Sequence, residues 1–105
     1  MIQDKFNKKN MIYKITKDID LEGETLVILT GCTIDFQGGK ILNGVIELNN
    51  TKILPNGSLI KDYITAKING TYCIGQCLYD DNINKPIWWT GTKWTDANGQ
   101  EVQHE

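Results

Sequence analysis

The sequence predicts an all-β fold in which short β-solenoid (β-helix) coils are followed by a small β-meander. Three Asn-Gly pairs, at residues 43–44, 56–57 and 69–70, lie thirteen residues apart, and short apolar runs fill the intervals. Asn-Gly favours tight turns because both residues tolerate positive φ at low cost. The longer gaps contain Gly, Asn or Pro, so no helix is expected. Together these features indicate strands joined at regular corners.

Side chains repeat as well as turns. Residues 33–37 (Thr-Ile-Asp-Phe-Gln) match residues 45–49 (Val-Ile-Glu-Leu-Asn), and residues 40–42 match residues 52–54, each twelve positions apart. A β-rich repeat this short is typical of stacked strand-and-corner units, so the units are expected to stack with their Asn residues at a shared corner. A run of ordinary hairpins, in which Asn-Gly is also common, is the alternative.

Length and composition exclude several classes of protein. The 105 residues have room for one domain with at most a small appendage. A net charge of −2 gives no reason to expect nucleic acid or an anionic membrane as partner. Three cysteines without dense spacing suit a protein made in a reducing cytosol. The sequence has neither the apolar length of a membrane span nor, in its first ten residues, the apolar core of a signal peptide.

Residues 1–18 are expected to form an N-terminal arm. Phe6 is the only large apolar side chain before Met11, which is typical of a segment that is disordered alone or docked on a partner. Residues 11–16, at the end of the arm, are a candidate first strand.

Residues 19–70 are the expected β-solenoid region. Ile19 and Leu21 alternate with acidic residues, which places the apolar and acidic side chains on opposite strand faces. The acids fit a solvated face better than a calcium site, because the spacing lacks the bent loop of an EF-hand. Residues 25–29 form a continuous run that predicts a strand covered on both faces.

Residues 71–105 are expected to form a Trp-rich β-meander and a polar tail. Strands are predicted at residues 71–80, 85–89 and 92–96, joined by turns that contain Gly or Asn. All three tryptophans fall in this part of the chain.

No catalytic constellation can be assembled from these residues. His104, the only histidine, lies in the polar tail, where a catalytic base would lack a preorganised surrounding. Cys73 and Cys77 have the wrong spacing for a zinc knuckle. Asp80 and Asp81 are adjacent, so on a strand they point to opposite faces, unlike the paired carboxylates of a glycosidase. We therefore expect no enzyme activity, no metal and no cofactor.

The three tryptophans are the one group with ligand-binding chemistry. On a strand, Trp88 and Trp89 face opposite sides, so one is expected in the core and the other exposed or at a subunit contact. An exposed Trp with polar neighbours could stack on a sugar ring. Alternatively, the tryptophans form the core of a meander that lacks other bulk. The candidate glycan-binding set is Trp88, Trp89, Trp94, Tyr79, Asp80 and Asn82.

Two parts of the chain resemble bacteriophage proteins. Residues 19–26 and 31–40, with the Asn-Gly at 43–44 and the segment 49–53, resemble the opening coils of pectin-lyase-like parallel β-helices in phage tail proteins. Residues 74–80 and 84–99 resemble a C-terminal module that ends many fibre proteins of gut tailed phages, including the crAss-like group. The strings Lys-Pro-Ile-Trp-Trp and Lys-Trp-Thr-Asp occur there in the expected order.

This resemblance implies a structural virion protein, a short fibre or decoration subunit on head or tail, usually a homotrimer and made in the host cytoplasm. Residues 1–18 would dock on other virion proteins, and the Trp-rich module would form the distal tip. The alternative is a receptor-binding tip that recognises a host surface glycan. The extended β-helix that carries the polysaccharide-cleaving groove of long tailspikes is missing, so depolymerase activity does not carry over.

Apolar burial also favours an intertwined homotrimer. Three or four short coils are expected to be too few to bury a core from one chain, and open strand edges invite pairing. Trimerisation would supply the missing contacts and cover the edges. The residues expected in a shared or coil-internal core are Ile34, Phe36, Ile46, Leu48 and Ile53.

Overall fold

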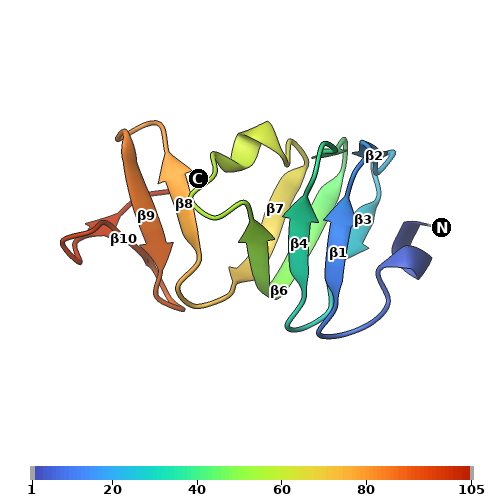
Figure 1. The fold of residues 1–105 in the computed structure, drawn as a ribbon, viewed down its shortest axis with the longest axis horizontal. Helices are drawn as coiled ribbons and strands as arrows, with labels where there is room; N and C mark the ends of the chain where they lie inside the picture. Colours follow the sequence, from blue (N-terminus) through green and yellow to red (C-terminus); the bar gives the residue numbers. More distant parts are fainter. Residues whose placement is uncertain (1, 105) are drawn as a thin grey trace.

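The computed structural model describes residues 2–104 and is predominantly β, as the sequence predicts (Figure 1). Parallel strands come first and an antiparallel sheet follows. The helical elements of residues 2–104 are two short 3-10 segments, η1 (Ile2–Lys5) and η2 (Ile60–Asp62). The strands are β1 (Ile12–Ile15), β2 (Ile19–Asp20), β3 (Thr25–Val27), β4 (Thr33–Phe36), β5 (Ile41–Leu42), β6 (Val45–Leu54), β7 (Lys67–Tyr72), β8 (Cys77–Asp80), β9 (Lys85–Trp89), β10 (Trp94–Thr95) and β11 (Glu101–Val102).

The parallel strands belong to three small sheets. β1, β4 and the end of β6 form one; β3, the start of β6 and β7 form a second; β2 and β5 form a third. Ile12 pairs with Thr33, and Thr33 pairs with Lys52, so the chain returns to the first sheet after 21 and then 19 residues. We call each such return a circuit.

The segments that repeat after twelve residues were expected to stack on one another, and in the structure they do not. Thr33–Phe36 pairs with β1 and the end of β6, whereas the matching segment at the start of β6 pairs with β3 and β7. The matched segments are therefore two different sides of one circuit, separated along the chain by β5, and do not stack on one another. They look alike because each side turns alternate apolar side chains inward.

The three Asn-Gly pairs also do not share a corner. Asn43 has a left-handed φ of 60° between β5 and β6, but Asn69 and Gly70 lie inside β7, and residues 56–57 lie in the loop before η2. A Cβ at Gly70 would collide with the carbonyl oxygen of Leu48 on the neighbouring strand. Glycine therefore permits close backbone approach at this position and does not make a turn.

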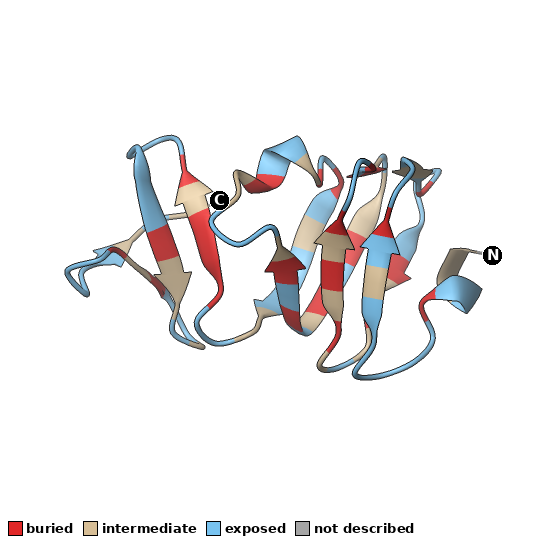
Figure 2. Cartoon of the chain, viewed as in Figure 1, coloured by how far each residue is buried: buried red, intermediate tan, exposed pale blue. Residues whose placement is uncertain are grey.

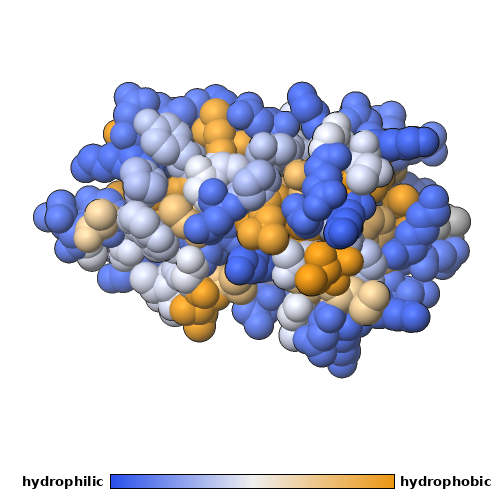
Figure 3. All heavy atoms as spheres, in the orientation of Figure 1, coloured by the Kyte–Doolittle hydropathy of each residue, from blue (hydrophilic) through white to orange (hydrophobic). Residues whose placement is uncertain are grey.

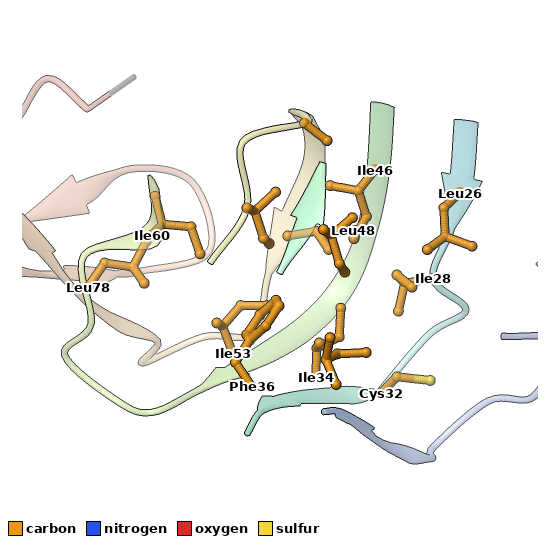
Figure 4. Packing of buried hydrophobic residues seen from close by; sticks show 14 of the residues in the cluster. Leu26, Ile28, Cys32, Ile34, Phe36, Ile46, Leu48, Ile53, Ile60 and Leu78 are labelled. Carbon is orange, nitrogen blue, oxygen red and sulfur yellow. The ribbon is translucent and has the colours of Figure 1, made fainter. Parts of the chain in front are cut away.

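The expected core residues are all buried within the single chain. Ile34, Ile46, Leu48 and Ile53 are fully buried and Phe36 is 4% exposed (Figures 2 and 4). The expectation that one chain has too few coils to bury a core is therefore wrong. Three inward-facing sides enclose the side chains without help from another subunit.

Residues 2–18, the expected arm, are part of the parallel stack of their own chain: β1 is one of its strands, and the residues before β1 pack on the stack. The Gln3 side chain accepts a hydrogen bond from the Val27 N–H and donates one to the Val27 carbonyl oxygen, both at 2.7 Å. Phe6 is buried, with its ring 4.7 Å from that of Tyr13. Gln3 thus occupies the position that a neighbouring strand would take beside β3.

The C-terminal strands form an antiparallel meander in the order β11-β10-β9-β8. The single strand predicted at residues 71–80 is instead two strands, β7 and β8, on different sheets. They are separated by a turn in which Gly75 has a φ of 88°. The molecule measures 42 × 24 × 22 Å, with η1 and the meander at opposite ends of its long axis (Figure 1).

Candidate functional site

The six residues of the candidate glycan-binding set do not form one surface. β8 and β9 pair antiparallel, with Cys77 opposite Trp88 and Leu78 opposite Ile87. Side-chain alternation on β9 places Trp88 and Trp89 on opposite faces of the meander, as predicted. Trp89 contacts Trp94, with ring centroids 5.3 Å apart, whereas Trp88 lines a hollow on the other face.

Trp94 is the centre of an aromatic cluster between the meander and the parallel strands. Its side chain is buried, and the rings of Tyr72, Trp89 and His104 lie 5.2, 5.3 and 5.1 Å from it. Burial raises the pKa of Tyr72 to about 12, because the phenolate would be poorly solvated there. Packed rings surround Trp94, so its main role is structural and it is not an open platform for a sugar.

Asp80 is held inside the protein by His104. The Asp80 carboxylate is 1% exposed and its Oδ2 lies 3.0 Å from His104 Nδ1, while its Oδ1 accepts a hydrogen bond of 2.8 Å from the Asn82 N–H. Burial by itself would raise the pKa of Asp80, but the hydrogen bonds from His104 and Asn82 oppose it, and the pKa is lowered on balance. Both oxygens of the Asp80 carboxylate therefore bond partners within the protein.

His104 is the residue whose role the sequence does not reveal. It lies two positions beyond β11, where residues 101–102 pair with β10 and carry the tail back to the meander. Only 12% of its side chain is exposed. A polar tail gives no local signal for this placement, because the partner Asp80 is 24 residues away.

The carboxylates of Asp80 and Asp81 have different partners, and Asp80 is the last residue of β8 whereas Asp81 begins the turn after it. Asp81 forms an exposed ion pair with Lys61 of η2. Tyr79, Asp80 and Asn82 line a small hollow of 220 Å³ beside η2. Asp81 lines the same hollow, and each of the two carboxylates is engaged with its own side-chain partner, Lys61 or His104.

Trp88 borders a shallow hollow of 310 Å³ on the outer face of the meander, together with Thr95, Asp96, Ala97 and Gly99. Trp88 is half-buried, so part of its ring system is accessible. The Gln100 N–H donates to Asp96 and is the main cause of a lowered pKa of that carboxyl, assisted by the Asn98 N–H and the Lys85 ammonium group against the effect of burial. This hollow combines an aromatic ring, a hydroxyl and an ionised carboxylate.

A cavity of 460 Å³ lies between β7 and the meander. Its lining is apolar and aromatic apart from two lysines and a histidine: Ile60, Lys61, Ile64, Ala66, Lys67, Ile68, Gly70, Tyr72, Trp94 and His104. We call it the junction groove. Its volume falls within the range typical of small-ligand and peptide sites.

Cys32, Cys73 and Cys77 are free thiols, and burial raises the pKa of Cys77. Within residues 2–104 no group of three His, Cys, Asp or Glu side chains converges as a metal site would. The helical segments in the same range are too short to span a membrane.

Comparisons with protein-family models, with curated proteins and with solved structures find no match to this chain. Function is therefore inferred from the residues and their geometry.

Proposed function

We propose that this protein is a structural component of a bacteriophage virion, a short fibre or decoration subunit. The observation that carries the proposal is the elongated stack of parallel strands with unlike ends. One end carries η1 and β1, and the other carries the Trp-rich meander (Figure 1). A body of this form suits a spacer that attaches at one end and presents the other outward.

The parallel strands are proposed to be a short β-solenoid. Returns to the same sheet after 21 and 19 residues, with buried side chains in register on successive circuits, support this interpretation. Residues 2–18 stabilise the first circuit and would present the surface that docks on other virion proteins.

We also propose that the protein forms a homotrimer. The open edge of a strand supports this, since the core is already buried within one chain. β1 is the last strand of its sheet, and Ile12 on it is 64% exposed. Apolar atoms form separate patches among hydrophilic ones on the face seen in Figure 3. Association through strand edges, with small apolar contacts beside them, fits this distribution better than one large apolar interface.

Light scattering of the full-length protein at several concentrations tests the trimer. The expected mass is three times the 11.9 kDa of one chain and should persist on dilution. The variant Ile12→Lys should reduce that mass, whereas Ile83→Lys, at an exposed apolar position in the β8–β9 turn, should not. A monomer across the concentration series would contradict the trimer.

Attachment to the virion needs its own experiment. Gold-labelled antibody against the purified protein should decorate intact particles of a phage that encodes it, at one defined position on head or tail. Particles that lack the label, together with free antigen in the lysate, would contradict a virion role.

A second candidate function, recognition of a host surface glycan, is favoured by the hollow at Trp88. The accessible ring could stack on a sugar, and the Thr95 hydroxyl could bond one of its hydroxyl groups. On a glycan array, Trp88→Ala should abolish any binding while Ile83→Ala leaves it intact. Glycan signals that survive Trp88→Ala, or no signal for the wild type, would refute this function.

A further inference from the structure

The column of apolar side chains in the second sheet ends at the junction groove. Leu26 on β3, Ile46 on β6 and Ile68 on β7 are paired in register. Leu26 and Ile46 are fully buried, whereas Ile68 is only half-buried and lines the groove. A side chain on one further strand would cover Ile68 in the way that Ile68 covers Ile46.

The backbone of β7 is also open on this side. β7 pairs with β6 alone, and the Lys67 N–H donates to the Gly44 carbonyl oxygen, so Lys67 and Asn69 direct their backbone groups toward β6. Because alternate residues of a strand bond to opposite sides, the backbone groups of Ile68 and Gly70 point toward the groove. Within residues 2–104 neither makes a backbone hydrogen bond outside the β6–β7 ladder.

The charges along the groove are of one sign. Lys61 and Lys67 line it, and no carboxylate is among its lining residues. Lys61 already pairs with Asp81, whereas Lys67 is exposed and forms no ion pair with any residue between 2 and 104. The side chain of Lys67 is on the opposite face of β7 from that of Ile68. A neighbouring strand whose residues alternate between apolar and acidic would place apolar side chains beside Ile68 and carboxylates beside Lys67.

We propose that the junction groove binds an extended acidic peptide of a partner protein by strand addition to β7. The peptide would place an apolar side chain over Ile68, exchange backbone hydrogen bonds with Ile68 and Gly70, and direct carboxylates toward Lys67. This inference stands on the geometry of β7 alone and does not depend on the proposed virion role.

A bead-displayed library of random octapeptides, screened with the full-length labelled protein, identifies the partner chemistry. Peptides that alternate apolar and acidic residues should be enriched. The best peptide should be resynthesised with a methyl group on one of the backbone nitrogens that face β7. It should then bind about ten-fold more weakly, because one hydrogen bond is lost.

Variants of the protein complete the test. Lys67→Glu should weaken binding of the same peptide by about ten-fold or more, through reversal of the local charge. Lys93→Glu, an equal change at an exposed position on the meander, should leave the affinity unchanged. In ¹⁵N–¹H spectra the Ile68 and Gly70 amide signals should move on binding.

Three results would overturn the proposal. One is a library screen with no enrichment of acidic extended peptides. Another is equal loss of affinity in Lys67→Glu and Lys93→Glu, and the third is an unchanged affinity after backbone methylation. Protection of the Ile68 amide from hydrogen exchange that increases with protein concentration would also overturn the proposal. It would show that a second copy of this chain, and not a partner peptide, occupies the edge of β7.

Discussion

The side-chain amide of Gln76 pairs with the backbone of Ile53 as a strand would. The Ile53 N–H donates to Gln76 Oε1 at 2.7 Å, and Gln76 Nε2 donates to the Ile53 carbonyl oxygen at 3.0 Å and to that of Cys77 at 3.0 Å. Gln76 is 2% exposed. Gln3 bonds Val27 in the same way at the other end, so a glutamine amide closes one strand edge at each end of the parallel stack.

Replacement of Gln76 should therefore be costly. Gln76→Ala leaves the buried N–H and carbonyl of Ile53 without partners, and we expect the free energy of unfolding to fall by about 3 kcal/mol. Chemical denaturation measures the change. Gln100→Ala, which truncates an exposed glutamine side chain, should shift stability by no more than about 0.5 kcal/mol. Equal effects of the two substitutions would contradict the strand-like role of Gln76.

The tryptophans should differ in their contribution to stability. Trp94→Ala removes the centre of the aromatic cluster and should cost about 3–5 kcal/mol. Trp88→Ala removes a half-buried ring on the outer face and should cost less than about half as much. Thermal and denaturant unfolding of both variants provide the comparison. A larger loss from Trp88→Ala would place the core on the other face of the meander.

Acid should destabilise the meander through Asp80. Its pKa in the folded protein is lowered from 3.8, so its contribution to stability is fully present above pH 3.8. That contribution is lost as the pH falls from 3.8 through the lower folded pKa, because the unfolded state then binds the proton more readily. Asp80→Asn should flatten this part of the stability–pH curve, measured by denaturation from about pH 6 downward through the pKa of a free Asp.

Asp18→Asn is the control for this experiment, since Asp18 is an exposed carboxylate on the opposite end of the chain. Its curve should follow the wild type. If Asp80→Asn also follows the wild type, the Asp80–His104 contact does not stabilise the fold.

Alkali should destabilise the protein through Tyr72. Its pKa rises from 10.0 in the unfolded chain to about 12 in the folded protein. The stabilisation is therefore complete below pH 10 and is lost as the pH rises through 12. At about pH 11 the wild type should have lost roughly 1 kcal/mol that Tyr72→Phe does not lose. Identical slopes for the two proteins between about pH 9 and about pH 11 (one unit either side of 10) would show that Tyr72 is not desolvated.

Much of the local structure can be predicted from the sequence because it depends on neighbouring residues. Alternation along residues 33–36 and 45–48 identifies the buried side chains correctly, and the turns that contain Gly and Asn separate β8, β9 and β10. Alternation also predicts that Trp88 and Trp89 face opposite sides. In each case the direction of a side chain follows from the two-residue period of a strand.

Strand pairing depends instead on contacts between distant residues. The same alternating pattern suits a segment that stacks on its repeat and one that forms another side of the same circuit, so the twelve-residue repeat could not decide between them. Asn69-Gly70 has the composition of a turn, yet the approach of the Leu48 backbone places it within a strand.

The sequence by itself determined that this chain is predominantly β, that the alternate apolar side chains of residues 33–36 and 45–48 face a core, and where the turns between β8, β9 and β10 lie, because each of these depends on local periodicity. Only the tertiary structure decided that the core closes within one chain, that Gln3 and Gln76 seal strand edges, that His104 bonds Asp80, and that β7 borders an open groove. These relationships join residues more than twenty positions apart, and they arise from backbone groups and buried charges that must find partners once the strands have packed.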